Sequence, residues 1–286
     1  MIETELNTAR KEITVKGICQ GETWLNITSG SNKVSVKILI KEFAGYLPES
    51  LNITVSGNPC PKDIVRKAVL VNLDQSVNLN KNAKYSIEWI KLKKIKNTYP
   101  DEEYSFHIPV TLKGKDYIEL KKNITIHVKN TAFDQNEARY LYLSNNPETV
   151  NSNQVVYNQN ISDVSKNRLF FHHRNADASN VKNFYVKLTN ISQKPSEILI
   201  SQADSGPTQP EIQAGHMAVL NYFLNSVNQT NWLLNIPAGK SCIITNQRLY
   251  PGDVVSGIYD LELLDNSKIN IKIIMTSDPY EFSQTP

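Results

Sequence analysis

The sequence predicts an all-β protein made of two antiparallel β-sandwich domains, the second of which contains one short α-helix. Apolar residues recur at every second position in short segments of both halves, which is the pattern of strands with one buried and one exposed face. Clusters of Asn, Pro, Gly and Ser separate these segments, as expected for antiparallel sheets. The length of 286 residues corresponds to roughly two domains of ordinary size.

The first predicted domain covers residues 12–130 and follows a polar N-terminal extension, residues 1–11. It opens with "EITVKGICQ" and closes with "NITIHVKN", and both segments alternate apolar and polar residues. In "KVSVKILI", one face of the expected strand carries Val34, Val36, Ile38 and Ile40. We expect this face to be buried in the first sandwich.

The second predicted domain covers residues 140–276, between a linker at 131–139 and a C-terminal tail at 277–286. It contains a helical segment at 215–227, "GHMAVLNYFLNSV". Apolar residues of this segment lie three or four positions apart on one helix face, namely Met217, Leu220, Leu224 and Val227. We expect this face to pack inward, so that the helix closes one end of the sandwich.

Two adjacent histidines, His172 and His173, lie in the segment "RLFFHHRN". Neighbouring residues of a strand point to opposite faces of the sheet, so His173 shares a face with Leu169 and Phe171, and His172 lies on the other face. Two such side chains cannot readily bind one metal ion. We therefore expect one histidine near the core, one at the surface, and no metal at either.

The sequence has no recognisable catalytic or cofactor motif. It contains no G-x-S-x-G nucleophile elbow, no phosphate-binding loop and no G-x-G-x-x-G dinucleotide motif. The cysteines lack the spacing of a zinc ribbon or a redox pair. We therefore predict a protein that is not an enzyme, with no catalytic residues, no metal site and no cofactor.

Three cysteines occur, Cys19, Cys60 and Cys242. Cys19 and Cys60 belong to the same predicted domain and could form a disulfide in an oxidising environment. The alternative is that all three are separate small apolar residues. The sequence leaves both alternatives open.

The charge of the chain limits its partners. The formal net charge of +3 does not by itself indicate a nucleic-acid partner, and the absence of an 18-residue apolar run predicts no membrane-spanning helix. Residues 1–130 carry a net positive charge, whereas residues 131–286 carry a net negative charge. Opposite charges on the two halves favour head-to-tail contacts between copies.

Two patterns resemble known surface proteins. A polar turn and an aromatic strand, "NTYPDEEYSFHIPV", followed by the final strand "NITIHVKN", resemble immunoglobulin-like modules of bacterial surface proteins. In the second half, "AGH", "IPAGKS" and "LYPGDVVSGIYDLEL" resemble a module at the ends of surface and secreted proteins of low-GC Gram-positive bacteria. These resemblances imply an extracellular location or a place on the cell or spore surface.

We therefore predict a structural or adhesive surface protein that assembles with other copies of itself into an extracellular fibre, a spore appendage or a coat. Other surface proteins or glycans are further expected partners. An N-terminal strand containing Ile13 and Val15 would add to the sheet edge of a neighbouring copy. At the other terminus, Tyr280 and Phe282 would supply apolar contacts.

The alternative is a glycan- or protein-binding β-sandwich module of a secreted protein. Exposed aromatic rings would support this alternative, because sugars stack on such surfaces. The candidates are Trp24, Trp89 and Trp232. Trp232 precedes two leucines and is expected to lie in the core instead.

Overall fold

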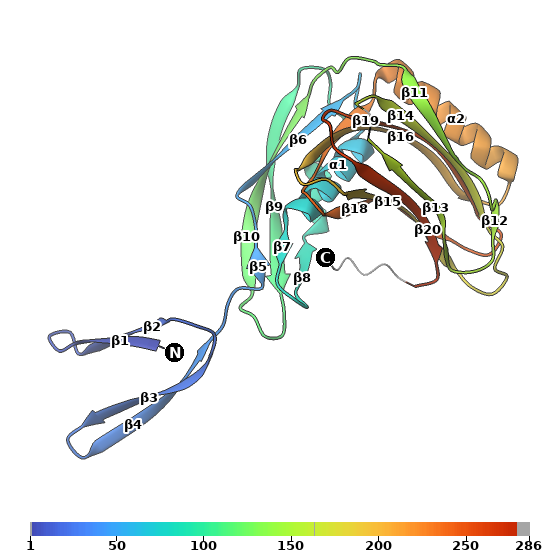
Figure 1. Ribbon diagram of the computed structural model, residues 1–286. Coiled ribbons are helices and arrows are strands. Elements are labelled where there is room, and N and C mark those ends of the chain that lie inside the picture. The colour runs from blue at the N-terminus through green and yellow to red at the C-terminus, as the bar shows by residue number, and fades with distance from the viewer. Residues whose placement is uncertain (1, 163, 279–286) are drawn as a thin grey trace. The chain divides into compact units, whose positions relative to one another are not determined.

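The computed structural model describes residues 2–162 and 164–278 and, for residues 89–91, the backbone alone (Figure 1). The protein is all-β, which confirms the predicted fold class. Its contacts define two compact units, formed by residues 1–46, 78–87 and 110–122 and by residues 47–77, 88–109 and 123–286. The predicted domains 12–130 and 140–276 stay a prediction, because contacts within one chain do not measure independent folding.

The first unit contains two antiparallel hairpins. β1 (Ile2–Asn7) pairs with β2 (Glu12–Gly17), and β3 (Gly21–Ser29) pairs with β4 (Asn32–Ile40). The turn between β3 and β4 contains Gly30, whose φ of 63° is readily adopted only by glycine. Short pairs complete the unit: β5 (Gly45–Tyr46) with β7 (Asn78–Leu79), and β8 (Lys84–Ile87) with the end of β9 (Glu103–Lys113).

A large sheet dominates the second unit. Its strand order is β11 (Ala138–Ser144), β14 (Lys166–Asn175), β19 (Val254–Leu263), β16 (Ser196–Thr208), β17 (Asn231–Ile236), β6 (Ser50–Ser56), β10 (Leu120–Asn130) and β9. β12 (Thr149–Val150) also pairs with β14. The pairs β6–β10, β11–β14 and β12–β14 run parallel, which is compatible with their long connections because hairpins join only antiparallel strands.

A second, four-stranded sheet covers the inner face of β14, β19 and β16. It has the order β13 (Gln154–Ile161), β20 (Ile269–Thr276), β15 (Lys182–Asn190) and β18 (Ser241–Leu249). Between the sheets, the Phe171 ring lies 5.0 Å from the Phe184 ring and 5.1 Å from the Tyr259 ring. The Phe171 ring fills the space that a side chain at position 257 would need. A Cβ atom added to Gly257 would lie only 2.3 Å from Phe171 Cζ, so glycine is required there. The result is a β-sandwich with an aromatic core.

In the part of the chain that the structure describes, two α-helices accompany the strands, together with a short 3-10 helix, η1 (Trp89–Lys94). α1 (Lys62–Ser76) packs on β6, β17 and β18. α1 is not predicted from the sequence, although its buried positions 65, 68, 69, 72 and 73 follow a helical period, because Leu70 and Val71 add apolar residues outside this stripe and the polar Asn72 falls within it. α2 (Glu211–Asn228) confirms the predicted helix and begins one turn earlier. Within the described residues, no helix combines the length and hydropathy needed to cross a membrane.

Candidate functional site

The most unusual surface of the second unit is the solvent-facing side of α2, which is apolar. Ile212 is 82% exposed, Phe223 59% and Val227 81%. We call this surface the α2 apolar face, and it consists of Ile212, Met217, Val219, Leu220, Phe223, Leu224 and Val227. A helix on the surface of a soluble protein normally turns such residues toward the core.

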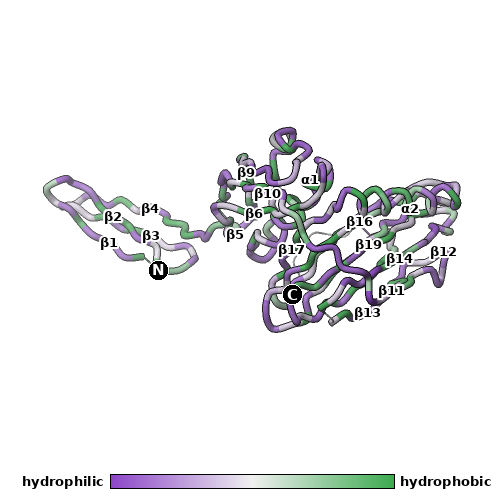
Figure 2. The backbone as a smooth tube through the Cα atoms, turned by 90° about the horizontal axis from the view of Figure 1, so that it is seen from above, coloured by the Kyte–Doolittle hydropathy of each residue, from purple (hydrophilic) through white to green (hydrophobic). Residues whose placement is uncertain are grey.

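This arrangement corrects the expected packing of the helix. Met217, Leu220, Leu224 and Val227 do not close an end of the sandwich but are exposed. α2 instead lies along the outer face of the large sheet, against β16 and β19 (Figures 1 and 2). Its inner side carries the fully buried Ala214 and Ala218, whose small side chains permit a close approach of helix and sheet.

Two asparagines attach the inner side of α2 to β16. The Asn221 side-chain amide donates to the Asp204 carbonyl at 3.0 Å, and that of Asn225 donates to the Gln202 carbonyl at 2.7 Å. β17 pairs with β16 only over residues 196–200, so both carbonyls lie beyond that paired stretch. Backbone carbonyls that are shielded from water require hydrogen-bond donors. The side-chain amides of Asn221 and Asn225 supply these donors, which explains why asparagines occupy the inner side of α2 and the apolar residues lie on the outer side.

Charged contacts attach α2 to β14 as well. Arg168 binds Asp260 through two hydrogen bonds of 2.8 and 3.1 Å, and its guanidinium lies 4.8 Å from the centre of the Tyr222 ring. At the start of the helix, Arg174 donates to Glu211 at 2.7 Å. These contacts hold the flank of α2 and leave the apolar face unobstructed.

Apolar residues continue on the edge strand β11. Leu141 and Leu143 are exposed and pair in parallel register with Arg168 and Phe170 of β14. Since Arg168 contacts α2 on the outer face of the sheet, both leucines lie on that same face. The apolar surface of the second unit therefore extends from α2 to β11.

In the first unit, the hairpin β1–β2 contains the predicted contact residues Ile13 and Val15. Ile13 pairs with Leu6 and Val15 with Thr4, so the apolar residues Ile2, Leu6, Ile13 and Val15 share one face of the hairpin. Leu6 and Ile13 are exposed, and Val15 is partly exposed. The role of Ile13 and Val15 in subunit contact stays a prediction.

The hairpin β3–β4 repeats this amphipathic pattern. Leu25 pairs with Val36 and Ile27 with Val34 on one face, whereas the opposite face carries the ion pair between Lys37 and Glu22, 2.7 Å long. The expectation that Val34 and Val36 are buried in a sandwich is wrong, because both are exposed. No residue from 2 to 43 is buried.

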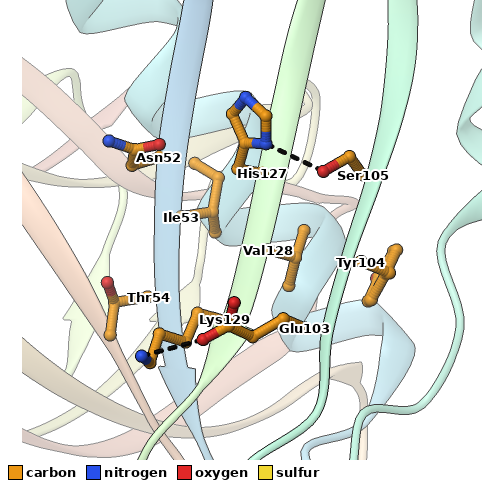
Figure 3. A pocket seen from close by; sticks show the side chains of 9 residues that line it. All are labelled: Asn52, Ile53, Thr54, Glu103, Tyr104, Ser105, His127, Val128 and Lys129. Carbon is orange, nitrogen blue, oxygen red and sulfur yellow. Dashed lines mark hydrogen bonds and ion pairs between the residues drawn. The ribbon is translucent and has the colours of Figure 1, made fainter.

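A shallow depression of about 550 Å³ lies over β6, β10 and β9 in the second unit (Figure 3). Its polar side chains come from alternate positions of the three strands. Ser105 and His127 are hydrogen-bonded, with 2.8 Å between Oγ and Nδ1, and Lys129 forms an ion pair with Glu103 at 2.8 Å. The remaining lining residues are Asn52, Ile53, Thr54, Tyr104 and Val128.

A serine beside a histidine is the minimum of a nucleophile and its base. On the same two strands, however, Thr125 and His107 form an equivalent pair, with 3.1 Å between Oγ1 and Nδ1. Both pairs are at the exposed surface. Repetition along the strands is typical of cross-strand pairing, and we assign these contacts to sheet stabilisation.

The structure confirms that His172 and His173 lie on opposite faces of β14. His173 is fully buried, and both of its ring nitrogens are occupied: Nδ1 donates to the Pro147 carbonyl at 2.9 Å, and Nε2 accepts from the Ser144 hydroxyl at 2.9 Å. Burial lowers the pKa of His173 to about 4. His173 is therefore a neutral core residue at neutral pH. In the described part of the chain, no three His, Cys, Asp or Glu side chains are grouped so as to hold a metal ion.

The remaining predicted residues are distributed as follows. Cys60 and Cys242 are buried thiols, and burial raises the pKa of Cys60 to about 12. Cys19 is exposed, and the predicted pairing of Cys19 with Cys60 stays a prediction. Tyr280 and Phe282 lie outside the described residues.

The tryptophans differ in their exposure. Trp232 is fully buried, as expected, and its indole N–H donates to the side-chain oxygen of Gln202 at 3.2 Å. Trp24 is exposed on β3. The side chain of Trp89 lies outside the described part of the structure. The described tryptophans therefore form no row of exposed rings.

Sequence reasoning missed the α2 apolar face because it assumed that the apolar face of a helix is the buried face. A signal was present in the stripe Ala214, Ala218, Asn221 and Asn225, spaced by three or four residues. Such a stripe of small and amide side chains can itself pack on a sheet edge whose carbonyls need donors.

Comparison with known proteins identifies no family. No protein-family model and no curated protein matches the chain. Among solved structures, a study of promiscuous specificity in carbohydrate-binding modules of the β-sandwich superfamily includes a chain that is 8% identical. The match covers 62% of this chain and 75% of that chain, with a TM-score of 0.18. At that score the likeness carries no argument about function.

Proposed function

We propose that the protein is a non-enzymatic structural or adhesive surface protein whose copies assemble head to tail through the N-terminal hairpins. The observation that carries the proposal is the state of residues 2–40: two amphipathic hairpins, each with an apolar face, and no buried residue among them. An isolated two-stranded hairpin is marginally stable in water, and packing on another element stabilises it. A neighbouring copy would supply that element.

Assembly by strand addition fits the form of these hairpins. Each two-stranded ribbon has two outer edges, and such edges can pair with a sheet edge of a neighbour. Each main-chain hydrogen bond contributes about 0.5–1.5 kcal/mol net. Burial of Ile13 and Val15 would add to this gain and help offset the ordering of the segment.

The opposite net charges of the two halves of the chain are compatible with a head-to-tail contact, which propagates into a filament when it does not close. A place on the cell or spore surface, or in an extracellular fibre, follows from the resemblance to immunoglobulin-like surface modules. Both inferences belong to this proposal.

Deletion of residues 1–41 tests the proposal. We expect the full chain to form a concentration-dependent series of higher oligomers in light scattering and fibres in negative-stain microscopy, and the deleted form to lose the fibres and all species larger than a dimer. A finer test substitutes one strand: Val15→Lys places a charge on the apolar face of β2, whereas Thr14→Lys places it on the polar face. Only Val15→Lys should block assembly.

A separate deletion of residues 279–286 tests the predicted contacts of Tyr280 and Phe282. If the full chain, both deletions and both lysine variants are the same monodisperse monomer, assembly is excluded. The glycan- or protein-binding alternative then takes its place.

A further inference from the structure

The α2 apolar face points to a second contact between copies, independent of the N-terminal hairpins. We infer that two copies associate through this face, with their α2 helices antiparallel about a two-fold axis near Val219 and Leu220. The inference rests on the size of the face, its symmetry and its lack of charge.

The face is large enough for a stable dimer. Its seven side chains are 38–82% exposed, and with roughly 150–200 Å² for a large apolar side chain they leave roughly 700 Å² uncovered. The largest apolar patch on a typical monomer is about 300–600 Å². A standard interface takes about 800 Å² from each partner, and Leu141 and Leu143 of β11 can supply the remainder.

The two ends and the centre of the face are placed symmetrically along the helix. Ile212 and Val227, the most exposed residues at the two ends, are equally distant from the point between Val219 and Leu220. In an antiparallel pair centred there, Ile212 of one copy meets Val227 of the other, and Val219 meets Leu220. An isologous contact requires such self-complementarity.

The charge of α2 favours a second copy over a membrane surface. Helices that bind membrane surfaces are rich in Lys and Arg, whereas residues 211–228 contain neither. The only acidic residue of α2, Glu211, forms an ion pair with Arg174 of the same chain. His216, which titrates near neutral pH, is exposed and meets Phe223 of the other copy in this arrangement, so two identical helices can approach without like charges opposing each other.

A first experiment introduces charge into the face of the full chain. The double variant Val219→Glu and Leu220→Glu should weaken dimerisation by about 100-fold or more in analytical ultracentrifugation, because Val219 of one copy meets Leu220 of the other and the new carboxylates would oppose each other in a buried contact. Circular dichroism should remain unchanged, since both positions are exposed within one copy. As a control, Ile191→Glu changes an exposed apolar residue elsewhere on the unit and should leave the dimer intact.

A second experiment measures the geometry by cross-linking. In a Cys19→Ser background, Val219→Cys should cross-link to its own copy with a short bismaleimide. Ile212→Cys and Val227→Cys should each cross-link poorly alone and efficiently when the two variants are mixed. Cys60 and Cys242 are buried and serve as internal background.

Three results would overturn the inference: no cross-link at Val219→Cys, a strong self-cross-link at Ile212→Cys, which indicates parallel helices, or self-association unaffected by the double variant. If oligomers disappear only on deletion of residues 1–41, the hairpins mediate all association. If the α2 variants remove a dimer while longer assemblies fail to form in any variant, the two-fold contact stands and the head-to-tail proposal fails.

Discussion

The two α-helices described in the second unit differ in which side they bury: α1 buries its large apolar residues, and α2 buries its small and amide residues. α1 turns its apolar residues toward β6, β17 and β18, and Val65, Val69 and Leu73 are fully buried. α2 turns alanine and asparagine toward β16 and β19, and its large apolar residues face solvent. The interior of one copy explains the apolar residues of α1, whereas those of α2 remain exposed in a single copy.

Both helices nevertheless use the same device to attach to a strand. Asn72 of α1 donates to the Leu233 carbonyl of β17 at 3.1 Å, as Asn225 of α2 donates to Gln202 of β16. The helices differ in the residues around these asparagines. α1 packs large apolar side chains against its strands, whereas α2 packs the small side chains of Ala214 and Ala218. An attached helix with an outward apolar face indicates a surface made for contact.

The largest expected effect concerns the buried side of α1. Leu73→Ala should lower the free energy of unfolding by about 2–5 kcal/mol, because a fully buried leucine leaves a cavity. The matched change on α2, Leu224→Ala, should cost less than about 1 kcal/mol in the monomer, because Leu224 is exposed. Urea unfolding of both variants at low protein concentration measures the difference, and equal losses would contradict the contrast between the helices.

A similar contrast between a buried and an outward side exists in β14, where His173 is buried and His172 faces outward. The pKa of His173 is lowered to about 4 by burial, from 6.5. Between pH 6.5 and 4, the unfolded chain therefore binds a proton at His173 that the folded chain does not. The contribution of the neutral His173 to the free energy of unfolding is fully present above pH 6.5 and is lost as the pH decreases toward 4.

This loss should reach about 3 kcal/mol, since one pKa unit corresponds to about 1.4 kcal/mol. His173→Phe removes the titrating group, and its unfolding free energy should vary less with pH between 6.5 and 4 than that of the wild type. Urea titrations across this range provide the measurement. An identical pH dependence in both proteins would show that His173 is not the group responsible.

The smallest expected effect is the difference in stability lost when the asparagines that bind the strands, Asn72 of α1 and Asn225 of α2, are each replaced by alanine. Asn72→Ala should cost about 1–3 kcal/mol, because Asn72 is buried and its loss removes a hydrogen-bond partner from the Leu233 carbonyl. Asn225→Ala should cost about 1 kcal/mol, because that residue is only partly buried. Thermal unfolding of the two variants gives the comparison, and a larger loss for Asn225→Ala would mean that α2 depends more on its asparagines than α1 does.

Local patterns predicted much of the fold. The two-residue period identified the all-β class and placed His172 and His173 on opposite faces of one strand. The four-residue spacing from Leu220 to Leu224 identified a helix that the structure places at Glu211–Asn228. Each of these features depends on neighbouring residues and on the geometry of one element.

The sequence by itself determined which residues share a face, and only the tertiary structure decided what each face meets. The period of Val34 and Val36 is correct, yet β4 has no core against which to bury them. The helical period of α2 is also predicted correctly, yet the inner side of the helix is the one with asparagines, because they donate to the Gln202 and Asp204 carbonyls, which β17 does not pair. A periodic pattern records local geometry, whereas burial depends on partners that are distant in the chain or belong to another copy.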